Sequence, residues 1–118
     1  MRLIIPIIAF FLLCCPLLKG HAQNFAPIAR NDSGNTTEGN PVTIHILLND
    51  TDEDPGSSLN PSTVDLDPLL DLIQPEFSNS SGIFTVTPDG DVVFTPSAGF
   101  SGHAQASYTV NDNTDVTS

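Results

Sequence analysis

The chain has 118 residues, and three Lys and Arg stand against fourteen Asp and Glu, which gives a formal net charge of −11. An acidic surface repels nucleic-acid phosphates and anionic lipid headgroups, and it attracts cations. The composition therefore excludes a nucleic-acid partner.

Residues 1–22 have the features of a secretory signal peptide. Arg2 precedes an apolar run from Leu3 to Leu18, and Gly20-His21-Ala22 puts small residues at the −3 and −1 positions of a cleavage site. The rival is a membrane span, but the run is shorter than the ~20 residues that a bilayer core requires, and two prolines interrupt it. We expect export, with no membrane insertion after cleavage.

Cys14 and Cys15 raise another interpretation, a lipid-modified cysteine. That modification usually needs a small residue just before the cysteine, and Leu13 and Cys14 hold those places here. The pattern favours cleavage after Ala22 and a protein that is secreted or lies at the cell surface.

Residues 23–118 are long enough for one small domain. They contain no cysteine, and Arg30 is their one Lys or Arg, so their formal net charge is −13. An exported domain of this size without disulfides depends on core packing, with a metal ion as the other available support.

The first predicted strand is VTIHILL, residues 42–48, after a turn-rich segment with an edge strand around Ile28. Apolar residues alternate along it, which is the period of a half-buried strand. The expected inward set is Val42, Ile44, Ile46 and Leu48. A loop, NDTDEDPGSS, follows at residues 49–58.

Residues 62–67 alternate again, with Val64 and Leu66 facing the core. The next segment, PLLDLIQPEF at 68–77, contains two prolines that leave six residues between them, too few for a stable helix. We expect a crossover or a short irregular strand there.

A tight hairpin follows at GIFTVTPDGDVVF, residues 82–94. Pro88 presets φ for a turn and Gly90 supplies a positive φ, so PDG predicts a reversal between two strands. One more strand, 104–110, places Ala106, Tyr108 and Val110 on one face. About six short strands with regular turns and no credible helix predict an antiparallel β-sandwich.

The motif AxYxV at Ala106–Val110 resembles the A-x-Y-x-C strand of immunoglobulin-like domains. The resemblance implies that Tyr108 takes a tyrosine-corner position, with its hydroxyl bonded to backbone. Val110 then stands where an inter-sheet cysteine would be, opposite Ile44 or Ile46.

The wider pattern resembles the tandem immunoglobulin-like or cadherin-like repeats of large bacterial surface and secreted proteins. Five segments match it in order: Ala29–Asp32, Val42–Asp52, Asn60–Leu66, Gly82–Gly102 and Tyr108–Asp112. The resemblance implies an all-β sandwich at residues 23–118 that lacks its last strand, because members continue with roughly one more strand. One departure is His103-Ala104-Gln105, where the family commonly carries an acidic residue and an aromatic.

The loop at Asn49–Asp54 places three aspartates at alternate positions, and carboxylate oxygens are the ligands that Ca²⁺ prefers. It is not an EF-hand, because Pro55 stands where that motif needs Gly. The resemblance extends the set of structural Ca²⁺ ligands to Asp32, Asp50, Asp52, Asp54 and Asp112. The alternative is an acidic, solvated loop.

The sequence gives little support for a zinc site or for catalysis. His45 and His103 are far apart and no cysteine joins them, so a zinc site is not expected. Asp89 and Asp91 flank Gly90 and are explained by the turn. No motif joins a nucleophile to a base, and a 96-residue sandwich has no room for a deep cleft, so we expect no catalytic residues and no enzyme.

Two functions remain. The first is a non-catalytic extracellular spacer or cell-adhesion module, stiffened by calcium, whose partners are neighbouring repeat domains or surface ligands. The second is a ligand- or glycan-binding accessory module of a secreted hydrolase, although the chain has no Trp and one Tyr for stacking on sugars.

Overall fold

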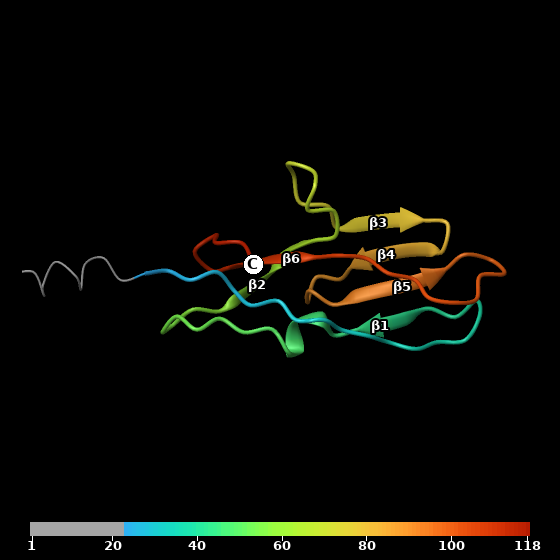
Figure 1. Ribbon diagram of the computed structural model, residues 1–118, viewed down its shortest axis with the longest axis horizontal. Helices are drawn as coiled ribbons and strands as arrows, with labels where there is room; N and C mark the ends of the chain where they lie inside the picture. The colour runs from blue at the N-terminus through green and yellow to red at the C-terminus, as the bar shows by residue number, and fades with distance from the viewer. Residues whose placement is uncertain (1–22) are drawn as a thin grey trace, which may run out of the picture.

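The computed structural model describes residues 23–118, so the predicted signal peptide lies outside it (Figure 1). Six strands of these residues form two antiparallel sheets. One sheet has the order β1-β5-β4-β3, formed by Val42–Ile44, Val92–Pro96, Gly82–Val86 and Glu76–Asn79. The other pairs β2, Leu59–Asp65, with β6, Thr109–Asp112.

A single apolar cluster joins the two sheets. Val64 of β2 and Val110 of β6 are 1% and 0% exposed, and they share the core with Phe84 and Phe94 of the four-stranded sheet. Side chains of both sheets therefore pack face to face, and the predicted all-β antiparallel sandwich is confirmed. The core also includes Ile46, one of the two predicted neighbours of Val110.

The predicted hairpin is present as β4 and β5. Phe84 pairs directly with Phe94, and their ring centroids lie 4.5 Å apart. Gly90 has a φ of 86°, and its backbone N–H donates to the Thr87 carbonyl at 2.9 Å, which closes the turn. The aromatic contacts continue to Phe77 and Phe100, so the rings of Phe77, Phe84, Phe94 and Phe100 pack in one row.

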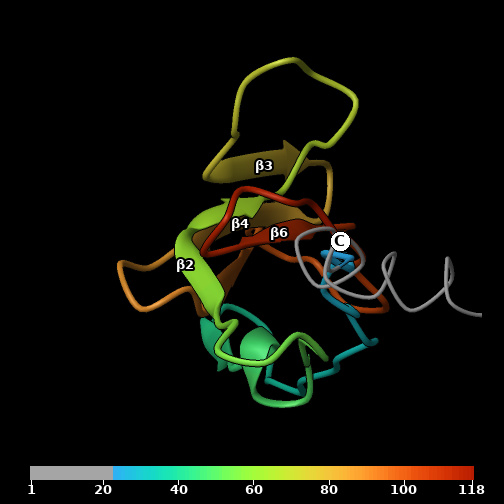
Figure 2. The ribbon, with the colours of Figure 1, turned by 90° about the vertical axis from the view of Figure 1, so that its left-hand side faces the viewer.

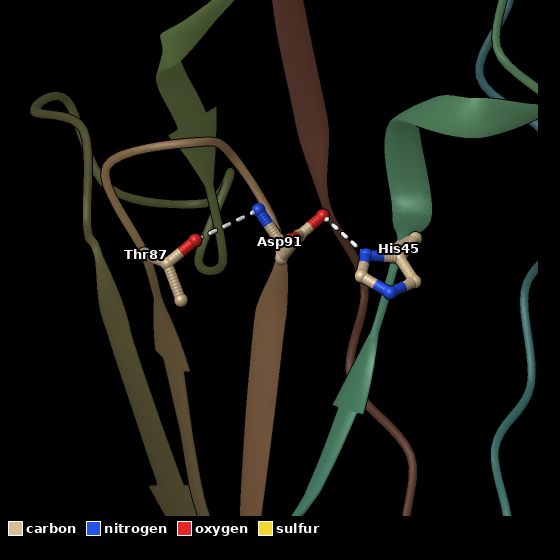
Figure 3. Close-up of polar contacts among 3 residues, drawn as sticks. All are labelled: His45, Thr87 and Asp91. Atoms are coloured by element: carbon tan, nitrogen blue, oxygen red, sulfur yellow. Dashed lines mark hydrogen bonds and ion pairs between the residues drawn. The ribbon is translucent and has the colours of Figure 1, made fainter.

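An ion pair ties the hairpin turn to the end of β1 (Figure 3). His45 Nδ1 lies 3.0 Å from Asp91 Oδ1, and the Asp91 backbone N–H donates to Thr87 Oγ1 at 3.2 Å. The His45 side chain is 59% exposed, so the pair contributes at most about 1 kcal/mol. His45 thus connects the end of β1 to the hairpin turn.

The strand predicted over 42–48 is wrong beyond Ile44. The chain leaves the sheet at His45 and forms one 3₁₀ turn, Ile46–Leu48. The turn still buries Ile46, but Leu48, expected to face inward, is 83% exposed. The turn also directs the following residues back toward the N-terminal segment, where Ile28 and Thr51 form an isolated antiparallel bridge.

Two other strand predictions need correction. β2 begins and ends earlier than 62–67, although Val64 and Leu66 are buried as expected. β6 begins at Thr109, because residues 104–108 have no strand partner among residues 23–118. Their side chains nevertheless follow a strand-like alternation, with Ala106 half-buried and Ser107 exposed.

The segment between β2 and β3 is a crossover that projects away from both sheets (Figure 2). Its base is closed by a backbone hydrogen bond from Leu66 N–H to the Gln74 carbonyl at 2.9 Å. At its tip, Leu69 and Leu72 are 93% and 75% exposed. Leu69, Leu70 and Leu72 therefore add almost nothing to the core.

Candidate metal centre and tyrosine network

Three carboxylates converge at one end of the two-stranded sheet. Asp52 and Asp54 lie in the loop before β2, and Asp112 is the last residue of β6. One oxygen from each lies within 4.8 Å of the others. The pairing of β2 with β6 brings these residues together, because Leu59 stands opposite Asp112. We call this group the Asp52–Asp54–Asp112 cluster.

Asp112 is fully buried, and groups of the surrounding loop donate hydrogen bonds to its carboxylate. Its Oδ1 accepts three hydrogen bonds at 2.8 Å, from the backbone N–H groups of Thr114 and Val116 and from the Thr114 hydroxyl. Burial raises the pKa of Asp112, but these bonds and one from Asn24 outweigh it, so the pKa lies below its ordinary value. Asp112 is therefore an anion at neutral pH.

The two loop aspartates are less completely bonded. The Asp54 backbone N–H donates to Asp52 Oδ1 at 2.9 Å, and the Phe25 backbone N–H donates to Asp54 Oδ2 at 2.7 Å. Asp52 Oδ2, however, is buried and has no hydrogen-bond partner among residues 23–118. A buried carboxylate oxygen without a donor is unfavourable unless a cation or water contacts it.

No basic side chain of the described part neutralises this cluster. Arg30 is the one Lys or Arg in residues 23–118, and its Nη1 donates instead to the Asn49 carbonyl and to Thr51 Oγ1. Three carboxylates within a few ångströms of one another repel. The donor set is oxygen only, which fits Ca²⁺ and does not fit zinc.

A second group of polar residues surrounds the Tyr108 hydroxyl. The hydroxyl oxygen lies 2.8 Å from Asp50 Oδ2 and 3.1 Å from Asp32 Oδ2. The carbonyl oxygens of Arg30 and Ile46 lie at 3.0 and 3.3 Å. A phenol has one hydrogen to donate, so these four acceptors compete for it.

Burial and the neighbouring Asp50 carboxylate raise the pKa values of Asp32 and Tyr108. Burial raises the pKa of Asp32, and the charge of Asp50 raises it further, although hydrogen bonds from Tyr108 and Asn49 oppose both effects. The pKa of Tyr108 is raised by burial and by its bond to Asp50, so the phenol stays protonated. The neutral Tyr108 hydroxyl is therefore a hydrogen-bond donor placed between the side chains of Asp32 and Asp50.

A model of the bacterial Ig domain family matches residues 24–118. This chain belongs to the bacterial Ig domain family. The resemblance to immunoglobulin-like repeats is thereby confirmed. No curated protein and no solved structure gives a significant match.

Bacterial Ig domains are typically non-catalytic modules, and they are usually extracellular or associated with the cell surface. Within residues 23–118, no helix has the length and apolar character that a bilayer crossing demands.

In this bacterial Ig domain the five aspartates predicted as ligands fall into two groups. Asp52, Asp54 and Asp112 come together, whereas Asp32 and Asp50 lie at Tyr108. Asp50 Oδ1 also accepts the Arg30 backbone N–H at 2.7 Å, so hydrogen bonds engage both of its oxygens. The Tyr108 hydroxyl contacts backbone carbonyls, as the resemblance implies, but these belong to Arg30 and Ile46, far from the entrance of β6 in the chain, and two carboxylates join them.

Sequence reasoning missed two contributions. Asn24 Nδ2 donates to Asp112 Oδ2 at 3.3 Å and to Thr114 Oγ1 at 2.7 Å. The Phe25 N–H bonds to Asp54, as described above. Asn24 and Phe25 are the second and third residues after the predicted cleavage site, and no spacing or composition signal distinguishes them. Only the folded chain places the N-terminal segment across this cluster.

Proposed function

We propose that this bacterial Ig domain is an extracellular spacer or adhesion module that binds structural Ca²⁺ at Asp52, Asp54 and Asp112. The observation that carries the proposal is the convergence of three carboxylates around the unpartnered, buried Asp52 Oδ2. The formal net charge of −13 over residues 23–118 adds a long-range attraction for cations. Asp32 and Asp50 are left out of the proposed site because Tyr108 engages them.

Bound Ca²⁺ would act on stiffness as well as stability. The cluster joins the loop before β2 to the end of β6, and Asn24 and Phe25 bond to two of its carboxylates. A cation there would hold three segments that are distant in sequence, and it would offset the repulsion of their charges. A rigid terminus is the property that a spacer or adhesion module requires.

Thermal unfolding of the purified protein tests the calcium site. After removal of metal with EDTA, we expect Ca²⁺ to raise the free energy of unfolding, by about 2.7 kcal/mol at a concentration one hundred times the dissociation constant. Mg²⁺ should give a smaller rise, because it demands tight octahedral geometry and dehydrates reluctantly. Identical melting temperatures in EDTA and in millimolar Ca²⁺ contradict the proposal.

Matched variants locate the effect. Asp52→Asn should abolish most of the calcium-dependent shift, because it removes one charge from the cluster and keeps the side-chain size. Asp89→Asn makes the same charge change at the exposed hairpin tip, and it should leave the shift intact. Equal loss in both variants would assign the effect to net charge and not to a site.

The exposed apolar loop supports a contact role with neighbouring repeat domains or surface ligands. Leu69 and Leu72 are exposed far beyond what this domain needs for its own packing, and such patches mark interaction sites. Beads coated with the protein would be tested for attachment to cells, with Leu69→Ser/Leu72→Ser as the comparison. Weaker attachment of the variant supports adhesion, and no attachment by either protein leaves spacing as the function.

A further inference from the structure

The crossover between β2 and β3 concentrates exposed apolar side chains in one short stretch, and we call residues 67–74 the apolar loop. Leu69, Leu70, Leu72 and Ile73 are 93%, 53%, 75% and 46% exposed. They are four of the eight large hydrophobic residues that are exposed in the described part of the chain. Single exposed leucines are ordinary on protein surfaces, whereas a run of them marks an interaction site.

Hydrogen bonds close the base of the apolar loop. Asp65 Oδ1 accepts the backbone N–H groups of Asp67 at 2.9 Å and Gln74 at 3.1 Å, and the Leu66 N–H donates to the Gln74 carbonyl. Near the tip, the Leu70 N–H donates to the Asp67 carbonyl at 3.0 Å. A loop whose ends are joined in this way holds its leucines outward, and it loses less conformational freedom when it binds a partner.

The apolar loop lies away from the C-terminal residues. Val116 and Ser118 bond to Asp112 and Val110 on the side of β6 that faces away from β2. The apolar loop instead leaves the end of β2 and projects past β3 (Figure 2). A strand that continued the pairing along β6 would therefore not cover the leucines of the loop.

The apolar loop also carries acidic side chains and no basic ones. Asp67 and Asp71 lie within it, and Asp71 is exposed between two leucines. Glu76 follows at the start of β3 and is exposed as well. Arg30, the one Lys or Arg of residues 23–118, bonds to the acidic loop before β2 instead. The leucines therefore form an apolar surface with a negative border.

These charges decide among the candidate occupants of the surface. A lipid bilayer would have to accept Asp71 together with its neighbouring leucines, and a carboxylate in hydrocarbon is strongly unfavourable. A second copy of this chain, related by a two-fold axis, would bring the same carboxylates together. A protein surface with basic side chains around an apolar pocket gives the leucines a dry contact and the carboxylates an opposite charge.

We propose that the apolar loop binds a protein partner in which an apolar pocket is bordered by lysine or arginine side chains. This inference rests on the contact role proposed above for the same loop, and it specifies the chemistry of the partner. Leu69 and Leu72 enter the pocket, and Asp71 pairs with the basic border. The apolar contact supplies affinity, whereas the border charges supply the rate of association and the choice of partner.

Three synthetic amphipathic peptides of about 14 residues, roughly four turns of helix, test this chemistry. The first has a leucine face bordered by lysines. The second replaces the lysines with glutamates, and the third replaces the leucines with serines. In titration calorimetry with the purified protein, we expect the leucine–lysine peptide to bind saturably and the other two to bind at least about tenfold more weakly.

Matched variants assign the binding to the apolar loop. Leu69→Ser should weaken binding of the leucine–lysine peptide by about tenfold or more, because it removes an apolar side chain from the contact. Leu48 is 83% exposed in the 3₁₀ turn, so Leu48→Ser makes the same change elsewhere and should leave binding intact. Asp71→Asn should weaken binding about two- to fivefold at low salt. Asp89→Asn, at the exposed hairpin tip, should have no effect.

Phosphatidylcholine vesicles and sedimentation equilibrium test the other occupants. We expect the protein to stay off the vesicles and to remain a monomer. Vesicle binding or dimer formation that Leu69→Ser abolishes overturns the proposal, as does equal binding of the three peptides or equal binding by the two leucine variants. If the peptides bind equally while attachment to cells still depends on Leu69, the partner chemistry is wrong and the contact role stands.

Discussion

The Tyr108 hydroxyl lies 2.8 Å from Asp50 Oδ2, and this contact connects the residue before β6 to the acidic loop that leads to β2. Asp50 in turn accepts the Arg30 backbone N–H. One phenol therefore fixes the N-terminal segment and the start of the loop that carries Asp52 and Asp54. The tyrosine network and the proposed calcium site are neighbours in the fold, and each can be tested separately.

Replacing Tyr108 with Phe keeps the ring and deletes the donor. Asp50 and Asp32 then lose the proton that they share, so we expect the free energy of unfolding to fall by about 1.5–3 kcal/mol. Urea denaturation at neutral pH measures the change. A variant as stable as the parent protein would mean that water replaces the hydroxyl without cost.

The contributions of Asp32 and Asp112 to folding stability should change in opposite directions as pH rises. Asp32 has a raised pKa, so its contribution to folding stability falls as pH rises from the ordinary value of 3.8 through the raised pKa. Asp112 has a lowered pKa, so its contribution is fully present above 3.8 and is lost as pH falls through the lowered pKa.

Asn variants of these residues, compared in EDTA, expose that difference. As pH rises from 3 to 7, the free energy of unfolding of Asp32→Asn should rise relative to that of the parent protein. That of Asp112→Asn should fall relative to the parent over the same range. Urea unfolding at several pH values provides the measurement. Parallel pH profiles for the two variants would contradict the assignment of their environments.

Gly90 combines a positive φ with a close approach. A Cβ there would lie 2.6 Å from Leu47 Cδ1 and 2.9 Å from Pro61 Cβ. Gly90→Ala should therefore destabilise the fold by about 1–3 kcal/mol beyond the cost of the φ angle. Gly99→Ala is the control, because Gly99 has a φ of 74° with open space around its Cβ position. Equal losses in thermal unfolding would show that the contact at Gly90 relaxes freely.

Neighbouring leucines should differ sharply in their effect on stability. Leu66 is buried in the core, so Leu66→Ala should cost about 2–5 kcal/mol. Leu69, three residues later, is 93% exposed, and Leu69→Ala should change stability by less than about 0.5 kcal/mol. Chemical denaturation of both variants checks this, and a large loss at Leu69 would mean that the crossover loop packs on the domain.

Much of the fold was predictable because local patterns agreed with it. The alternation around Phe84 and Phe94, with Gly90 between them, predicts the hairpin that forms the centre of the larger sheet. The extents of other strands were not predictable, because a strand requires a partner as well as a pattern. Residues 104–108 have the pattern, but among residues 23–118 they have no strand partner.

The sequence indicated which residues belong to the candidate site, but it did not indicate which of them lie together. Asp50, Asp52 and Asp54 could be named from their alternate positions in one loop, whereas Asp32 and Asp112 were added by the resemblance to immunoglobulin-like repeats. Their division between Tyr108 and the Asp52–Asp54–Asp112 cluster depends on how β2 pairs with β6 and where the 3₁₀ turn ends β1. Those are contacts between segments far apart in the chain.

The sequence by itself determined the all-β class, the position of the tight turn and the acidic character that attracts cations, because these follow from side-chain period, backbone preference and charge. Tertiary structure alone decided which carboxylates meet, and which carboxylate oxygen lacks a donor among residues 23–118. The reason is that those properties depend on distances between residues that the chain separates and only folding brings together.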